Sequence, residues 1–193
     1  MTGTTLHLAH DEKADELLSR DPFALLTGML LDQRIPMEKA FAGPALIAER
    51  LGLSALDPAA VASADPETFA RVMAGPPAVH RFPRSMGERV QALASHVTGH
   101  YDGDAGAIWR DVASGRELVT RLTDLPGFGQ QKAKIFVALL GKQLGVRPDG
   151  WETAAGDYGL PGYRSVADVI DEASLQKVRE YKRSVKAAAK SAP

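Results

Sequence analysis

The chain has 193 residues, of which 45% are hydrophobic, so it is long enough for one domain or for two small lobes that share a core. It contains no cysteine, which excludes disulfides, zinc–thiolate sites and iron–sulfur clusters held by cysteine. The net charge of −1 hides an uneven distribution, because residues 1–70 hold 11 acidic and 5 basic side chains and residues 71–193 hold 13 and 18. A basic half can bind a polyanion, although a solvated helix surface would explain so mild an excess equally well.

No apolar run reaches the length of a membrane span, and the first residues lack the apolar centre of a signal peptide. We therefore expect a cytoplasmic protein with no membrane partner. We also expect a monomer.

Helix-start signals recur along the chain, and no segment shows the alternating pattern of a strand. Asp21-Pro22, Asp57-Pro58 and Asp65-Pro66 each place a capping carboxylate before a proline at the first helical position. Ser85-x-x-Glu88 and Ser114-x-x-Glu117 have the spacing of capping boxes. The predicted helices span 11–19, 22–33, 36–51, 58–63, 66–74, 85–100, 105–113, 115–123, 130–144 and 166–190, the last with a break near Ser174. The sequence therefore predicts an all-α fold.

The longest irregular segment covers residues 145–164 and contains five glycines and two prolines. Irregular segments of this length in compact domains are usually functional or disordered. Trp151, Tyr158 and Tyr163 favour an ordered segment with a role of its own.

Residues 125–134 read LPGFGQQKAK and join two predicted helices. Gly127 and Gly129 leave the backbone uncovered, and their N–H groups lie at the start of a helix, where an anion is favoured. Lys132 and Lys134 add positive charge in the following turn. The segment could bind nucleic-acid phosphates without reading the base sequence. An ordinary helix–helix turn with a glycine cap would have the same sequence pattern.

This hairpin resembles the LPGVG-type hairpin of the helix-hairpin-helix, Gly/Pro-rich loop, Asp (HhH-GPD) superfamily of DNA glycosylases, which includes endonuclease III. Upstream, DPFALLTGMLLDQRIPMEKA is similar to the early helix of that family, which ends in an LLSQQT-like sequence, with Gln33 in the first Gln position. The resemblance extends from about residue 21 to 149. It implies two helical lobes with a cleft between them: 22–141, with the helix-hairpin-helix at about 115–144, and 1–21 together with 142–193.

The family places its catalytic aspartate about eighteen residues after the lysine that bifunctional members use as nucleophile. Gln131 occupies that lysine position here, and Asp149 stands eighteen residues later, although Pro-Asp-Gly is also an ordinary turn sequence. A carboxylate there would stabilise the oxocarbenium-like sugar of glycosidic cleavage. Gln131 cannot form a Schiff base, and Lys132 lies about 100° further round the helix. The resemblance therefore implies a monofunctional DNA glycosylase that leaves an abasic site, with Asp149 at the mouth of the cleft.

Base release requires the damaged base to be flipped out of the duplex. By resemblance, Gln33 is the candidate residue to fill the space that the flipped base leaves in the duplex. His80 or Phe82 is the candidate residue to insert into the opposite strand, although a loop phenylalanine can equally dock against the next helix. Candidate base-pocket residues are Trp151, Tyr158 and Tyr163. Backbone contacts are expected from Gly127, Gly129, Gln130, Lys132 and Lys134.

In the family, hairpin carbonyls often hold a monovalent cation, and the matching carbonyls are those of Thr123, Leu125 and Phe128. We therefore expect no cofactor beyond a structural Na⁺ or K⁺, because the cysteine-held iron–sulfur cluster of some members is excluded. The expected partner is double-stranded DNA, with the protein on the nucleoid when bound. The alternative is a catalytically inert DNA-binding module that recognises bent or damaged DNA, which the atypical sequence after Asp149 favours.

Overall fold

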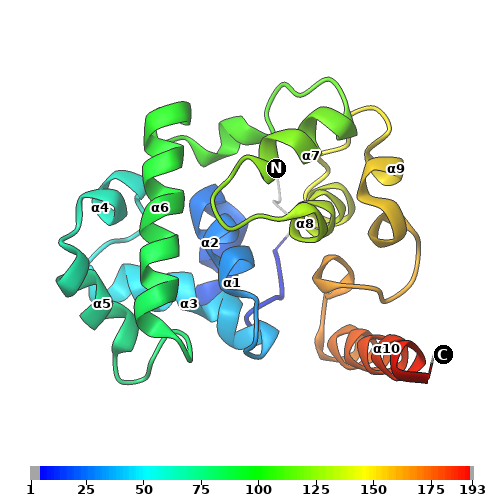
Figure 1. The fold of residues 1–193 in the computed structure, drawn as a ribbon, viewed down its shortest axis with the longest axis horizontal. Helices are drawn as coiled ribbons and strands as arrows, with labels where there is room; N and C mark the ends of the chain where they lie inside the picture. Colours follow the sequence, from blue (N-terminus) through cyan, green and yellow to red (C-terminus); the bar gives the residue numbers. More distant parts are fainter. Residues whose placement is uncertain (1–4, 192–193) are drawn as a thin grey trace.

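The structure is a computed structural model that describes residues 5–191, and every regular element in that range is helical (Figure 1). The elements are α1 (Glu12–Arg20), α2 (Pro22–Leu31), α3 (Met37–Arg50), α4 (Pro58–Ser63), α5 (Pro66–Ala74), α6 (Pro83–Tyr101), the 3-10 turn η1 (Ala105–Ile108), α7 (Gly115–Thr123), α8 (Gln130–Gln143), α9 (Trp151–Ala155), the 3-10 turns η2 (Gly156–Gly159) and η3 (Val166–Asp168), and α10 (Glu172–Ser191). The all-α prediction is confirmed. None of the helices in the described range is long and apolar enough to cross a membrane.

The Asp-Pro signals start helices as predicted, because each aspartate accepts hydrogen bonds from backbone N–H groups that the first turn leaves unpaired. Asp21 Oδ1 accepts from the amides of Phe23 and Ala24, both at 3.0 Å. Its second oxygen accepts the amide of Leu56 at 2.6 Å, which ties the cap of α2 to a distant loop.

Three predicted segments differ from the structure, and the predicted break in the last helix is confirmed. α6 begins at Pro83, so Ser85 lies inside the helix and does not cap it. The helix expected at 105–113 is only the short 3-10 turn η1. The irregular segment 145–164 contains α9 and η2. The last helix is divided into η3 and α10 just before Ser174, whose hydroxyl accepts the amides of residues 170 and 171.

α2 is the central helix of the molecule, and all residues from Phe23 to Leu31 are buried. A helix that is apolar all round must be covered on all sides. α3 covers one side closely, because Gly28 leaves room for the ring of Phe41. The end of α2 supports the hairpin between α7 and α8, where Leu30 lies directly under Gly127.

The packing does not follow the predicted division into lobes. α1, assigned by sequence to the second lobe, packs against α2 and α3 of the first. Buried residues from α1 through α10 form one contiguous core among the described residues. Residues 1–4 and 192–193 of the second predicted lobe lie outside the described residues.

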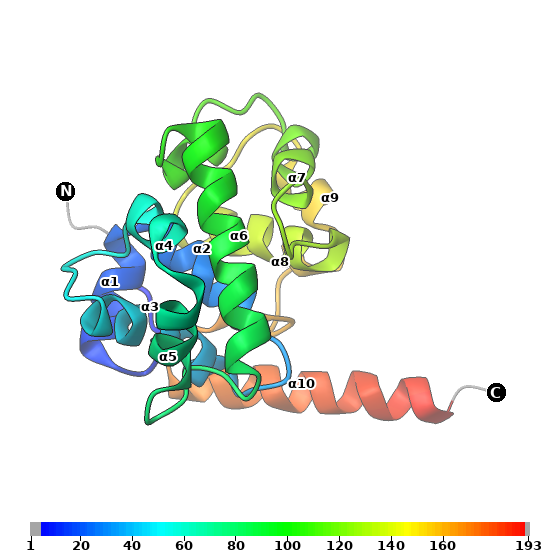
Figure 2. The same cartoon turned by 60° about the vertical axis from the view of Figure 1, so that its left-hand side comes forward.

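α10 lies beside the body along its first half only. Leu175 and Val178 are buried, and Arg179 donates to the Glu38 carboxylate of α3 at 2.6 Å. From residue 182 to residue 190 every side chain is exposed. Figure 2 shows this second half extending beyond the rest of the molecule.

Candidate nucleic-acid interface

The two hairpin glycines have different structural roles. Gly127 has φ +83°, a left-handed conformation, and a methyl group on it would overlap the side chain of Leu30. Gly129 is the N-cap of α8 with φ −81°, and a methyl group there would meet nothing within 4 Å. The fold therefore requires glycine at position 127 but not at position 129, where the start of α8 is open to a ligand.

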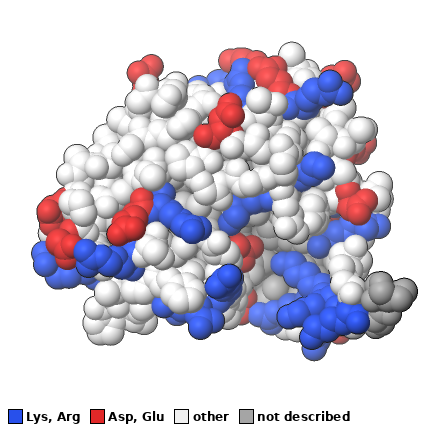
Figure 3. All heavy atoms as spheres, viewed as in Figure 1, with Lys and Arg blue, Asp and Glu red and all other residues white. Residues whose placement is uncertain are grey.

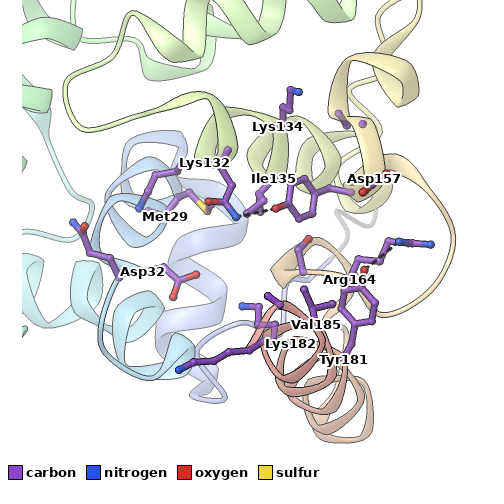
Figure 4. A pocket seen from close by; sticks show the side chains of 18 of the residues that line it. Met29, Asp32, Lys132, Lys134, Ile135, Asp157, Arg164, Tyr181, Lys182 and Val185 are labelled. Carbon is purple, nitrogen blue, oxygen red and sulfur yellow. Dashed lines mark hydrogen bonds between the residues drawn. The ribbon is translucent and has the colours of Figure 1, made fainter. Parts of the chain in front are cut away.

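An open cleft of about 1000 Å³ lies beside the start of α8 (Figure 4). Its other walls are the loop after α2, the segment around residues 155–165 and the second half of α10. Six basic and two acidic side chains line it: Arg34, Lys132, Lys134, Arg164, Lys182 and Lys186, against Asp32 and Asp157. Figure 3 shows basic side chains gathered around this hollow, where α10 lies. An excess of four positive charges in a cleft favours a polyanion.

Lys132 and Asp32 both line this cleft, and the pKa of each is shifted from its ordinary value. Lys132 Nζ donates to the carbonyl oxygens of Met29 at 2.6 Å and Leu30 at 3.1 Å, so the amine caps the end of α2. Burial lowers the pKa of Lys132 to about 8, partly opposed by the negative charge of Asp32. Burial likewise raises the pKa of Asp32, and the positive charges of Lys182 and Lys132 oppose this rise. Perturbed groups that share a cleft indicate a functional site.

The lowered pKa of Lys132 gives a direct chemical test. At pH 8 about half of these amines should be neutral, compared with roughly 0.3% for a lysine of ordinary pKa. Brief labelling with acetic anhydride, read by peptide mass spectrometry, should show Lys132 reacting with a midpoint near pH 8. Exposed Lys13 on α1 is the reference for an accessible lysine amine outside the cleft. The same pH dependence at both lysines would contradict the assignment.

Removing Asp32 should move that labelling midpoint further down, because its carboxylate favours the charged form of Lys132. An Asp32→Asn variant that left the midpoint unchanged would show that the two groups do not interact.

Lys132 was expected to point away from the position of Gln131, but both side chains line the same cleft. Gln131 Nε2 donates to the hydroxyl of Tyr158 at 2.9 Å, so the η2 turn is joined to the start of α8. Of the three candidate base-pocket aromatics, Tyr158 is the one that lines the cleft. Tyr181 of α10 lies in the opposite wall, where Arg164 donates to its hydroxyl at 3.2 Å.

Asp149 does not line the cleft, so the sequence-based placement at its mouth is wrong. Its carbonyl oxygen accepts the amide of Gly115 at 2.7 Å, and its side chain is exposed. Gly115 starts α7, whose opposite end leads into the hairpin. Asp149 therefore lies at the far end of the α7–α8 pair from Gln131.

Trp151 and Tyr163 are also outside the cleft lining. The ring of Trp151 rests on Gly141 of α8, where any side chain would overlap it, so this indole fixes α9 to α8. Tyr163 is 41% exposed, and the ammonium of Lys177 lies 4.6 Å from the centre of its ring. The contact of these two residues with a flipped base stays a prediction, at positions outside this cleft.

His80 is buried, with 1% of its surface exposed, so it is not placed to insert into a duplex at this surface. Its Nδ1 accepts the amide of Phe82 at 3.1 Å, which leaves the proton on Nε2 for the carbonyl of Gln33 at 2.9 Å. Burial lowers the pKa of His80, which agrees with this neutral form. Through these two hydrogen bonds His80 positions Phe82 and Gln33, the other residues expected to enter the duplex. Phe82 is 42% exposed at the start of α6, and Gln33 lines the cleft.

The remaining hairpin candidates are placed as follows. Gln130 is exposed at the start of α8, and Lys134 lines the cleft one turn further on. The carbonyl of Leu125 accepts the amide of Phe128 at 3.1 Å within the turn. Cation binding by the carbonyls of Thr123, Leu125 and Phe128 stays a prediction.

Sequence reasoning missed Asp32, Arg164, Tyr181, Lys182 and Lys186 as cleft residues. Asp32 stands directly before Gln33 in the segment that resembles the family's early helix, so the motif contained the signal. The basic residues of α10 contribute to the basic excess of residues 71–193, but no local pattern in the sequence indicates that they face α8.

Comparison of the sequence with models of known protein families gave no match. Comparison with curated proteins gave no match either.

Proposed function

We propose that the chain binds double-stranded DNA in the basic cleft and is a monofunctional DNA glycosylase of base-excision repair. The observation that carries the proposal is the cleft itself, where six basic side chains surround the open start of α8 and a half-buried carboxyl group, Asp32. Backbone phosphates suit the hairpin and the lysines, since such contacts need charge and uncovered N–H groups but no sequence readout.

The chemistry assigned to the cleft is hydrolysis of the N-glycosidic bond of a damaged or mismatched base. The bond between the base and C1′ breaks, the base keeps the bonding electrons, and the sugar gains positive charge. A carboxylate at Asp32 stabilises that charge and orients the water, whose oxygen bonds to C1′ while one of its protons neutralises the departing base. We assign stabilisation of the sugar cation to Asp32, because Asp149 lies outside the cleft.

Strand cleavage is not part of the proposal, although Lys132 faces the cleft. Attack by this amine would make an iminium nitrogen with one N–H, so Lys132 could no longer donate to both carbonyls of α2. One of the two carbonyls would lose this donor, and a buried acceptor left unsatisfied costs about 1–3 kcal/mol, although the carbonyl of Leu30 also accepts from Gln33 Nε2 at 3.4 Å. The structural hydrogen bonds of Lys132 therefore oppose its use as a nucleophile.

The test is base release from duplexes that each carry one of a panel of damaged or mismatched bases. The expected product is an intact strand that breaks only after hot alkali, with no covalent complex trapped by borohydride. Trapping of the parent protein but not of Lys132→Met would show that Lys132 acts as an amine nucleophile and that the enzyme is bifunctional.

The second candidate function is a catalytically inert module for bent or damaged DNA. The placement of Asp149 favours it, because the cleft lacks a carboxylate at the position that the resemblance implies. Tight binding to several lesion duplexes without base release from any of them would favour this function over the first.

The open backbone at Gly129 allows the hairpin contact to be tested without disturbing the fold. Gly129→Thr should leave stability unchanged, because threonine and glycine are similarly good N-caps and the site has free space. It should weaken duplex binding by about tenfold or more, since hydrogen bonds to charged groups are worth about 1.5–3 kcal/mol. Fluorescence anisotropy with a labelled duplex measures the affinity.

Gly99→Thr, at another exposed glycine with open space around it, is the matched control and should bind as the parent does. Gly127→Thr should instead destabilise the protein, because its side chain would overlap Leu30. Parent-like affinity of Gly129→Thr would mean that the hairpin is only a turn.

A further inference from the structure

The second half of α10 is strongly basic, and of its charges Lys182 interacts with the carboxylate of Asp32 across the cleft. Residues 182–190 contain Lys182, Arg183, Lys186 and Lys190 and no acidic residue, and all their side chains are exposed. The first half differs, because it contains Glu172 and Glu180 and packs on the body through its buried residues. We call residues 182–190 the basic arm.

The charges of the basic arm form a stripe. Lys182, Lys186 and Lys190 recur every four residues, so they lie on one side of the helix about 6 Å apart along its axis. Like charges at this spacing repel one another by roughly 0.2–0.5 kcal/mol per pair. A helical segment this short gains little stability by itself in water. The stripe therefore weakens the arm unless an anionic partner neutralises it.

The stripe faces a defined part of the protein. Lys182, Val185 and Lys186 line the cleft. Figure 4 shows Lys182 and Val185 across the cleft from Lys132 and Lys134 at the start of α8. An occupant of the cleft would thus meet positive charge from both walls. The root of the arm is fixed, since the ion pair between Arg179 and Glu38 holds α10 to α3.

We propose that the basic arm is a second backbone-binding element, which contacts phosphates of the same DNA duplex on the side opposite the hairpin. This inference rests on the proposed DNA binding but not on base release. The phosphates of a duplex form a row of negative charges that matches the stripe. The duplex would then be contacted from two sides, by the start of α8 and by the projecting basic arm.

The composition of the arm favours DNA over two other anionic partners. A helix that binds at a membrane surface needs large apolar or aromatic side chains on one face, and the arm offers only Val185 and three alanines. Protein interfaces are poor in lysine and alanine, which make up six of its nine residues. Lysines on a stiff helix suit contacts that need charge alone.

The experiment compares the salt dependence of duplex binding between two double variants. Lys182→Gln with Lys186→Gln removes two charges from the arm and keeps residues of good helix propensity. Lys13→Gln with Arg71→Gln removes two charges from exposed positions on α1 and α5, outside the cleft. Each lost phosphate contact should reduce the slope of log affinity against log salt by about 0.9. The arm variant should lose up to about two in slope and roughly tenfold in affinity, and the control should match the parent.

Hydrogen exchange gives an independent reading, because amides of residues 182–190 should become protected when duplex is added. Parent-like affinity and slope in the arm variant, with no added protection, would overturn the inference and leave the proposed function intact. A parent protein that does not bind duplex at all would overturn both. Protection by polyglutamate or by anionic vesicles, but not by duplex, would assign the arm to a different partner.

Discussion

Asp32→Asn should reduce the rate of base release by on the order of 10²–10³-fold, the usual cost of losing one well-placed electrostatic group. The amide keeps the size of the carboxyl group but cannot carry the negative charge that stabilises the sugar cation. DNA affinity should be unchanged or slightly higher, because a negative charge leaves a basic cleft. Single-turnover kinetics on the best lesion duplex separates the two effects.

The same substitution at Asp149 is the matched control. Asp149 is exposed, and its side chain is outside the cleft lining, so Asp149→Asn should release base at the parent rate. A loss of activity in Asp149→Asn, with Asp32→Asn active, would restore the role implied by the family spacing and would require the segment after α8 to move.

The pKa of Asp32 also sets the expected pH dependence. The mechanism needs its carboxylate, and burial raises its pKa above the ordinary value of 3.8. The rate should therefore fall with acid at a higher pH than for an exposed aspartate, as protonation removes the stabilising charge. A rate that stays constant down to pH 4 would contradict this assignment.

Lys142→Met should destabilise the protein by about 3 kcal/mol, the usual cost of leaving one partner of a buried ion pair uncompensated. Lys142 Nζ lies 2.6 Å from Asp168 Oδ1, with the two side chains only 18% and 8% exposed. Lys142 also donates to the carbonyl of Leu160 at 2.8 Å. Urea unfolding followed by circular dichroism measures the change.

Arg110→Met tests whether burial, and not the ion pair as such, causes that loss. Arg110 lies 2.7 Å from Asp104, nearly the same distance, but these side chains are 59% and 47% exposed. Exposed pairs contribute about 0–1 kcal/mol, so Arg110→Met should cost less than 1 kcal/mol. Equal losses in the two variants would contradict the explanation by burial.

The Lys142 interaction also bears on the cleft, because it holds the segment that forms one of its walls. Asp168 accepts the amides of Arg164 and Ser165 at 2.8 and 3.2 Å, and both residues line the cleft. Loss of Lys142 should therefore loosen this wall as well as lower stability.

The local features of the fold were predictable because their causes are local. An aspartate before a proline satisfies the amides of the turn that follows, so Asp21, Asp57 and Asp65 mark helix starts whatever packs around them. The hairpin glycines were recognisable only as a pair, because the letters do not show that Gly127 is left-handed and Gly129 is not. Ser85 shows the limit, because Pro83 started α6 earlier and left the capping-box spacing unused.

The cleft was only partly predictable, because its walls come from segments far apart in sequence. Counting residues placed Asp149 near Gln131, but the chain after α8 returns to the start of α7 and carries Asp149 away from the hairpin. Asp32 and Lys132 are 100 residues apart and acquire their perturbed pKa values only through burial in the folded protein. No periodicity in the sequence contains that information.

The position of Trp151 over Gly141 has a practical consequence for spectroscopy. The chain has two tryptophans, and the other, Trp109, packs against Phe136 of α8 with 5.6 Å between ring centres. Both indoles contact α8, and neither lines the cleft. Intrinsic fluorescence should therefore report the melting of the region around α8, with little direct contact quenching by an oligonucleotide bound in the cleft.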